Sequence, residues 1–205
     1  MFKNGVTKYY LFALSLIALD QIIKLLVYYY MQPGLLGEIK IFGNWFKLHY
    51  TLNPGMAFGL TLGPVYGKII LSIFRMIAVS AIAYYIYTIH KTAHKTYLWC
   101  MAAILGGAIG NVMDSTFYGV LLQNAPYDSI TPWFHGQVID MFYLDIWEGY
   151  LPDYLPLWGG EYTALWPIFN FADASIFVGV LIILIFQKKF LAETVPTEKA
   201  PANEN

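Results

Sequence analysis

The chain has 205 residues, of which 58% are hydrophobic, 18% aromatic and only 12% charged, and its net charge is −1. Soluble domains usually carry about 25% charged residues, so this composition excludes an ordinary soluble domain and is typical of an integral membrane protein. The single cysteine, Cys100, excludes an internal disulfide, and one cysteine with four histidines gives no metal-binding pattern.

Four segments are long and apolar enough to cross a hydrocarbon core of about 30 Å, which takes about 20 helical residues. They are Tyr9–Met31, Ile69–Ile89, Tyr97–Met113 and Trp166–Phe186. The first segment follows a basic N-terminus, as in a signal peptide, but Asp20 and Lys24 interrupt it, so we expect a retained helix. The predicted fold is an α-helical integral membrane protein with four transmembrane helices. It has one domain, residues 1–190, and a disordered cytoplasmic tail, residues 191–205.

The positions of the lysines predict the orientation, because cytoplasmic loops are enriched in Lys and Arg. Lysines precede the first helix, fill the loop between the second and third helices, and follow the fourth: Lys3, Lys8, Lys91, Lys95, Lys188 and Lys189. We therefore expect both termini on the cytoplasmic side. Residues 32–68 and 115–165 then form outer loops, and the second is acidic and aromatic, which suits a membrane interface.

The first outer segment contains FKLHYTLN, residues 46–53, in which apolar and polar residues alternate. This period of two predicts a half-buried strand. We expect a small β-sheet on the outer membrane surface, over about residues 38–62, with a turn at Pro54 and Gly55.

The residues that could carry chemistry are carboxylates. Asp20, Asp114 and Asp173 lie in or beside the predicted membrane helices, where ionisable groups are rare and mark functional sites. Asp173 is expected about two turns inside the fourth segment, and a rise of 1.5 Å per residue places it about 22 Å from the cytoplasmic lysines, near the outer surface. Two carboxylates held close together share a proton and can activate water for attack on an amide, without a cofactor.

Each carboxylate also has a purely structural interpretation. Asp20 and Lys24, at i and i+4, can form a neutralising ion pair. Asp114 can hold the outer loop in place, Asp140 can be an ordinary loop carboxylate, and Asp173 can interact with a helix dipole.

The other polar residues of the predicted helices are open to similar interpretations. Asn53, Asn111 and Asn170 can be caps or inter-helix hydrogen bonds. Arg75 lies about 10 Å along its helix from the outer end and can extend its side chain outward, so the sequence gives it no site role.

Five short blocks occur in one order along the chain: DQIIK (20–24), TLNPGMAFG (51–59), GGAIGNVMD (106–114), VIDMF (138–142) and FNFADASI (169–176). In this order they resemble the lipoprotein signal peptidases, or signal peptidase II. The resemblance implies an aspartyl endopeptidase of the bacterial cytoplasmic membrane, with its active site near the outer leaflet. It would cut prolipoproteins directly before a cysteine that carries diacylglycerol, and Asp140 and Asp173 would be its catalytic pair.

The resemblance also implies supporting residues and partners. Asn53, Asn111 and Asn170 match polar residues that line the family's site, and Asp20, Lys24 and Asp114 match further blocks. The implied partners are lipid-modified prolipoproteins and membrane lipids. We also expect no nucleic acid partner, no metal and no cofactor, and a monomeric enzyme.

The chain departs from the family's pattern at two places. Ser115 stands where the family usually has Arg, so no substrate contact of that Arg is carried over. Asp114 and Asp140 are 26 positions apart. The family commonly has few residues between the corresponding two aspartates, so we expect an enlarged outer loop.

The main alternative function is a proton-coupled transporter or channel, in which intramembrane aspartates relay protons. Four helices are few for a transporter, and the sequence shows no inverted repeat. A third interpretation is a non-catalytic membrane scaffold. Cleavage of a lipid-modified prolipoprotein by the purified protein would separate these functions.

Overall fold

A computed structural model describes residues 5–54, 66–154, 159–160 and 162–192. Its longest helices are α1 (Thr7–Tyr30), α2 (Gly67–Ile89) and α3 (Lys95–Met113). Helix α3 continues through a π-helical turn, η3 (Asp114–Tyr118), into α4 (Gly119–Leu121). Helices α5 (Phe171–Ile185) and α6 (Gln187–Ala192) follow near the C-terminus, and η1 (Leu35–Gly37) is a single 3-10 turn after α1.

Within the described residues, three continuous helical stretches are long and apolar enough to cross a membrane: Thr7–Tyr30, Gly67–Ile89 and Lys95–Leu121. Helix α5 is apolar but has only 15 residues. The predicted helix start at Trp166 is wrong because residues 165–170 are not helical, and α5 begins only at Phe171. Phe169 pairs with Phe142 in an isolated β-bridge, and Asn170 caps the helix. Asp173 therefore lies in the first turn of α5, not two turns inside a helix.

A small antiparallel sheet has the strand order β1 (Ile39–Phe42), β2 (Phe46–Asn53) and β3 (Val138–Leu144). Long apolar helices combined with a small sheet confirm that part of the predicted fold. Strand β2 covers the alternating segment, whereas the proposed turn at Gly55 and the rest of the 55–59 block lie outside the described residues.

The predicted outer loop of residues 115–165 begins later than expected and is not irregular throughout. The helix runs on to Leu121, and the segment contains β3 and a second hairpin, β4 (Glu148–Tyr150) with β5 (Tyr162–Ala164). Strand β3 is buried on both faces, so its sequence does not alternate between apolar and polar residues and gave no strand prediction. Of the predicted tail, 191 and 192 belong to α6, and the remainder lies outside the described residues.

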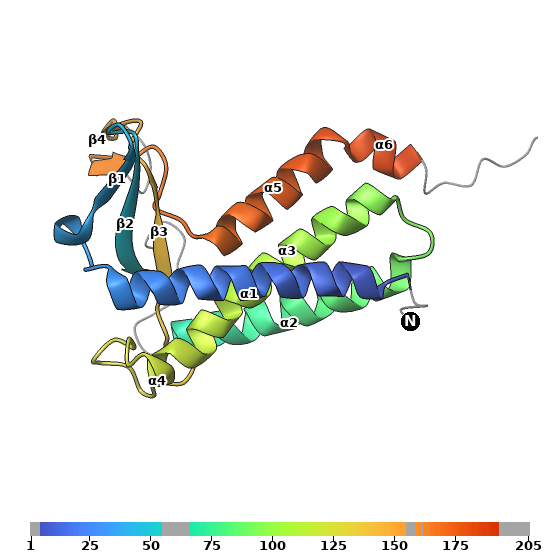
Figure 1. The fold of residues 1–205 in the computed structure, drawn as a ribbon, viewed down its shortest axis with the longest axis horizontal. Coiled ribbons are helices and arrows are strands. Elements are labelled where there is room, and N and C mark those ends of the chain that lie inside the picture. The colour runs from blue at the N-terminus through green and yellow to red at the C-terminus, as the bar shows by residue number, and fades with distance from the viewer. Residues whose placement is uncertain (1–4, 55–65, 155–158, 161, 193–205) are drawn as a thin grey trace, which may run out of the picture.

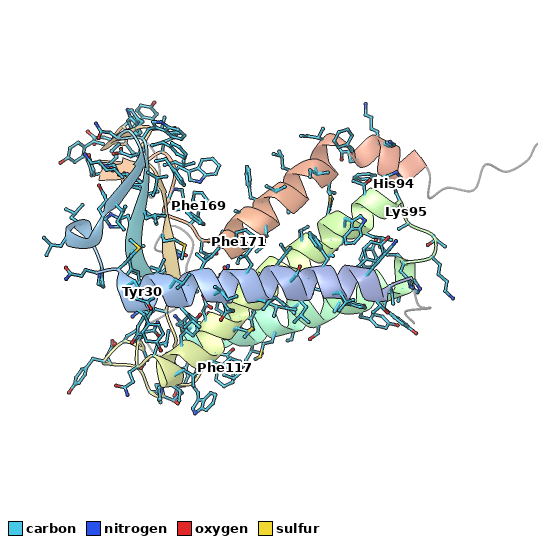
Figure 2. The ribbon with its side chains drawn as sticks, in the orientation of Figure 1. Tyr30, His94, Lys95, Phe117, Phe169 and Phe171 are labelled. Atoms are coloured by element: carbon cyan, nitrogen blue, oxygen red, sulfur yellow. The ribbon has the colours of Figure 1, made fainter. Side chains whose placement is uncertain are left out.

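Figure 1 shows the sheet at one end of the helices, while the start of α1 and α6 lie together at the other end. Figure 2 places Tyr30, Phe169 and Phe171 toward the sheet end, and His94 and Lys95 at the far end. Two apolar clusters fill the interior. One, between α1, α2 and α3, contains Tyr9, Ala13, Ile86, Leu98 and Leu105. The other, between α1, η3 and the sheet, contains Val27, Tyr50, Tyr118, Ile139 and Met141.

Helix α3 packs against α1, α2 and α5. Its glycines allow this close approach: a Cβ atom at Gly106 would lie 2.9 Å from the Ala13 carbonyl oxygen, and one at Gly110 would lie 2.6 Å from Asp20 Oδ2. Small residues at helix contacts let backbones approach closely in membrane proteins. The packing of α3 therefore brings the polar residues of α1 and α5 to one place.

Candidate active site

The eight residues singled out by the sequence meet in one hydrogen-bonded network at the sheet end of the helices. Helix α1 supplies two of them, α3 and its continuation two, α5 and its cap two, and the sheet two. These residues are Asp20, Lys24, Asn53, Asn111, Asp114, Asp140, Asn170 and Asp173. The functional candidates therefore come from five segments that are far apart in the sequence.

Asp173 is fixed by a capping box at the start of α5. The Asn170 side chain accepts a hydrogen bond from the Asp173 backbone N–H at 2.9 Å, and Asp173 Oδ2 accepts one from the Asn170 backbone N–H at 3.2 Å. Asn111 Nδ2 donates to Asp173 Oδ1 at 2.7 Å. A carboxylate in the first turn is also stabilised by the helix dipole. These contacts fix the orientation of the Asp173 carboxyl group, which remains partly exposed.

Asp140 is held differently, in the middle of β3, with 1% of its surface exposed. Asn170 Nδ2 donates to Asp140 Oδ1 at 2.6 Å, and Asn53 Nδ2 donates to Asp140 Oδ2 at 2.9 Å. Burial, followed by the nearby negative charge of Asp173, raises the pKa of Asp140 from its ordinary value to about 7. The hydrogen bonds from the two asparagines oppose this rise. Near neutral pH, Asp140 therefore spends much of its time protonated.

Asn170 joins the two carboxylates because it contacts both. Its backbone N–H and side-chain oxygen hold Asp173, and its side-chain NH₂ holds Asp140. The enlarged segments do not disturb this arrangement, since backbone bonds between Phe142 and Phe169 anchor β3 directly beside the cap of α5. Between Asp114 and Asp173 the chain also contains residues 122–137 before β3, and the paired strands β4 and β5. The long spacing between Asp140 and Asp173 thus leaves the pair together.

Lys24 is the buried cation at the centre of the remaining polar residues. Its Nζ lies 2.8 Å from Asp20 Oδ2, 2.6 Å from Asp114 Oδ2 and 3.0 Å from Asn111 Oδ1, and its side chain is fully buried. Asp20 Oδ1 also accepts a hydrogen bond from the Ala172 backbone N–H at 2.9 Å, in the first turn of α5. This ion cluster ties α1, α3 and α5 together. Asn111 connects it to Asp173.

Two members of the network were not singled out by sequence reasoning. Gln21 Nε2 donates to Asp114 Oδ1 at 2.8 Å, and Tyr118 donates its hydroxyl to Gln21 Oε1 at 2.9 Å. A polar amide between Asp20 and Lys24 in an apolar helix was a usable signal for Gln21. Tyr118 gave no signal, because a tyrosine in an aromatic, interface-like segment is unremarkable.

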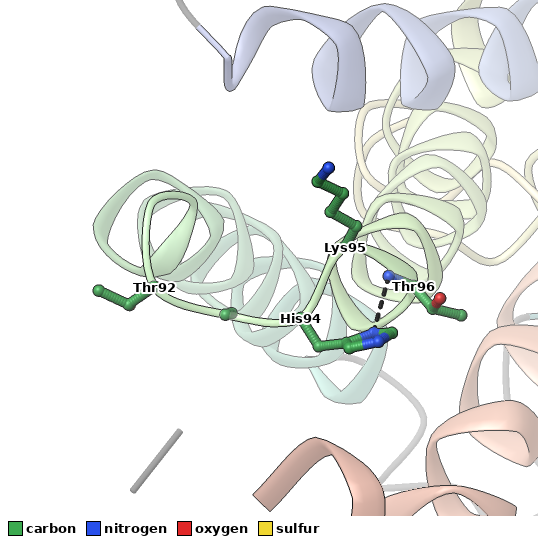
Figure 3. A pocket seen from close by; sticks show the side chains of 5 residues that line it. Thr92, His94, Lys95 and Thr96 are labelled. Atoms are coloured by element: carbon green, nitrogen blue, oxygen red, sulfur yellow. Dashed lines mark hydrogen bonds between the residues drawn. The ribbon is translucent and has the colours of Figure 1, made fainter. Parts of the chain in front are cut away.

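A hollow in the described part of the chain lies away from the aspartates. It has a volume of about 510 Å³ and is lined by Thr92, Ala93, His94, Lys95 and Thr96 (Figure 3). His94 Nδ1 there accepts a hydrogen bond from the Thr96 backbone N–H, as an N-cap of α3. The hollow lies at the far end of the helices and contains no carboxylate, so it is not the candidate site.

The arrangement of the two aspartates suits acid–base chemistry on a water molecule. One carboxyl is buried and readily protonated, and the other is partly exposed at a helix N-terminus. Paired carboxyl groups whose environments differ in this way commonly divide the roles of acid and base.

The sequence is similar to known proteins over most of its length. Residues 12–188 match the family described as signal peptidase (SPase) II. The chain is 49% identical to the lipoprotein signal peptidase of Amoebophilus asiaticus (strain 5a2), over 97% of this chain and 84% of that protein. It is 38% identical to the lipoprotein signal peptidase of Porphyromonas gingivalis (strain W83), over 83% of this chain and 78% of that protein.

A solved structure of a bacterial membrane enzyme, determined by the in meso method at 1.9 Å resolution, has a similar fold. The TM-score is 0.61 at 22% sequence identity, and the match covers 89% of this chain and 94% of that chain.

Proposed function

This chain belongs to the signal peptidase II family, and from that premise we propose how its aspartates carry out the reaction. It is an aspartic endopeptidase that removes the signal peptide from prolipoproteins. Asp140 and Asp173 are the catalytic pair, and the bond cut lies directly before the lipid-modified cysteine. The observation that carries the assignment is Asn170, which bonds to both carboxyl groups.

In the resting pair, Asp140 holds the shared proton and Asp173 is ionised. A water molecule bound to Asp173 attacks the carbonyl carbon of the scissile amide while Asp173 takes one proton from the water. Asp140 gives its proton to the carbonyl oxygen, which yields a neutral tetrahedral diol. The raised pKa of Asp140, about 7, makes it a competent acid near neutral pH.

The second step reverses the direction of proton transfer. Asp173 gives its proton to the amide nitrogen, the C–N bond breaks, and one hydroxyl of the diol returns its proton to Asp140. The products are the signal peptide with a new carboxyl end and the lipoprotein with a free amine on its lipid-modified cysteine. The pair regains its starting protonation state. Asn53, Asn111 and Asn170 keep both carboxyl groups oriented throughout.

The membrane arrangement that fits this reaction has four transmembrane helices, with α5 as the fourth. Both termini and the 90–96 loop lie in the cytoplasm, and the sheet lies at the outer surface. Support comes from Figure 1, in which the start of α1 and α6 lie at one end of the helices and the sheet at the other. Asp140 lies in strand β3 of that sheet. The acyl chains of the substrate stay in the outer leaflet, so its scissile bond meets the aspartates there. All eight site residues come from one chain, which supports a monomeric enzyme. Residues 1–190 form its single membrane domain, and its substrates are membrane-anchored lipoprotein precursors.

The test is cleavage of a diacylglyceryl-cysteine peptide by the purified protein in detergent. The wild type should release the signal segment, whereas Asp140→Asn and Asp173→Asn should each be inactive. Asp128→Asn is the matched control, because Asp128 is an exposed aspartate in the 122–137 segment. Activity in either pair variant, or inactivity of the folded wild type toward the lipid-modified peptide, would contradict the proposal. A proton flux through liposomes without cleavage would favour the transporter.

A further inference from the structure

One face of α2 carries two cations that the proposed reaction does not use. Lys68, Ser72 and Arg75 are spaced i, i+4 and i+7, so they lie along one side of the helix. Lys68 and Ser72 are buried and Arg75 is half-buried. Cations inside a membrane helix are expensive and mark functional positions.

Arg75 reaches the edge of the carboxylate network. Its Nη1 donates to Ser115 Oγ at 3.5 Å, and Ser115 directly follows Asp114. The guanidinium also interacts electrostatically with Asp173 and, more weakly, with Asp114. Ser115 is the position at which the sequence departs from the family's usual arginine. In this chain a guanidinium from α2 therefore occupies the space beside that serine.

The rest of the α2 face points into the same region. Ser72 Oγ donates to the Phe134 carbonyl oxygen at 3.2 Å, and the Phe134 backbone N–H donates to the Thr116 carbonyl oxygen at 3.3 Å. The face thus lies against η3 and the 131–136 segment. Lys68 Nζ, one turn before Ser72 on this face, is buried and, among the described residues, has no hydrogen-bond partner. A buried ammonium without a partner is costly, and a ligand that supplies acceptor oxygens would remove that cost.

The substrate supplies such oxygens. Around the scissile bond, the unmodified backbone offers peptide carbonyl oxygens, and the diacylglycerol group offers two ester carbonyl oxygens. Arg and Lys side chains carry donors only, and the planar guanidinium suits neighbouring oxygens in a chain. The donor-only side chains of Lys68 and Arg75 on one face of α2 therefore match the many acceptor oxygens where the diacylglycerol joins the peptide.

We infer that the Lys68–Arg75 face of α2 binds the lipid–peptide junction of the substrate, with Arg75 on the peptide carbonyl oxygens beside the scissile bond and Lys68 on the ester carbonyl oxygens. The inference rests on the proposed function. Arg75 is a positioning residue: it holds the scissile bond against the Asp pair but exchanges no proton. A guanidinium placed at Ser115 would reach the same oxygens, because Arg75 Nη1 and Ser115 Oγ are in contact.

The first experiment measures binding without turnover. The inactive Asp140→Asn protein is titrated with an uncleaved diacylglyceryl-cysteine peptide, alone and combined with Arg75→Gln. Loss of hydrogen bonds from a charged donor should raise the Kd by about 10–100-fold. Adding Ser115→Arg to the Arg75→Gln protein should restore most of the affinity. A general structural defect caused by Arg75→Gln would not be repaired in this way. An unchanged Kd in the folded Arg75→Gln protein would overturn the inference.

The second experiment separates the two cations by changing the ligand. An S-hexadecyl-cysteine peptide keeps the peptide carbonyl oxygens but has no ester oxygens. Lys68→Met should weaken binding of the diacylglyceryl peptide and leave binding of the S-hexadecyl peptide unchanged, whereas Arg75→Gln should weaken both. Equal losses for both peptides in Lys68→Met would overturn its assignment to the esters. If Arg75→Gln does not fold, Arg75→Lys serves instead, since it keeps the charge but loses the planar fork, and normal binding by Arg75→Lys would overturn the assignment of Arg75.

The third experiment uses turnover on the otherwise wild-type enzyme. Arg75→Gln should raise KM with little change in kcat, the signature of lost uniform binding, and Ser115→Arg should lower KM again. A large loss of kcat at unchanged KM would show that Arg75 acts on the Asp pair rather than on the substrate. Failure of the proposed function looks different, because the wild type would then not cleave at all.

Discussion

Replacing Asp140 by Asn should abolish catalysis and stabilise the protein at the same time. The variant keeps the size of the side chain and both neighbouring asparagines, but it can neither ionise nor hold the shared proton. Removal of one acid–base group typically costs about 10²–10⁴-fold in rate. The stabilisation arises because burial and the charge of Asp173 make the ionised form of Asp140 unfavourable in the folded state.

The size of this effect follows from the pKa. Folding raises the pKa of Asp140 from 3.8 to about 7, and one pKa unit corresponds to about 1.4 kcal/mol, so the full effect is about 4 kcal/mol. The sign is set by linkage: the folded state holds the proton more tightly than the unfolded state. The wild type therefore loses free energy of unfolding as the pH rises from about 4 to 7, and the loss levels off above 7. The variant lacks this loss.

The assay is thermal unfolding in detergent at pH 4.5 and pH 8, alongside cleavage of the diacylglyceryl-cysteine peptide. At pH 8 the Asp140→Asn protein should melt on the order of 10 °C above the wild type, and at pH 4.5 the two should nearly coincide. Identical pH dependence in the two proteins would refute the reasoning about burial. Near-wild-type turnover would refute the catalytic assignment, and a folded but inactive Asp114→Asn would then identify Asp114 as the partner of Asp173.

The pair should also behave as one unit. Asp140→Asn and Asp173→Asn should each remove nearly all turnover, and the double variant should be little slower than either single one, because residues that act together are non-additive.

Other perturbations test the surrounding structure. Lys24→Met leaves two buried carboxylates without their cation, and it should lower the free energy of unfolding by about 3–5 kcal/mol, as measured by thermal unfolding. Gly107→Ala should also destabilise the protein, because its Cβ would collide with a backbone carbonyl oxygen of α5, whereas Gly5→Ala, with open space around it, should not. Reporter fusions after Asn124 and after Ala93 should report opposite sides of the membrane, and the same side for both would contradict the topology.

The sequence by itself determined the elements whose signal is local. The apolar length of α1, α2 and α3 predicted helices that can cross a membrane, and the alternation in residues 46–53 predicted β2. Aspartates and asparagines stood out because polar groups in apolar segments are costly and need partners. Their order in five blocks indicated the family.

The tertiary structure decided what depends on contacts between distant segments. The start of α5 is set by the Phe142–Phe169 backbone pairing, which no local pattern encodes, so the sequence placed Asp173 too deep in its helix. The same pairing keeps Asp140 beside Asn170 despite the inserted residues, although spacing alone left that neighbour uncertain. Arg75 was assigned no role because its place near the outer end of its helix suggested a side chain that extends outward. The contact of Arg75 with Ser115 depends on how α2 packs against η3. Local periodicity fixes which face of an element is buried, but only the packing of the whole chain fixes what that face meets.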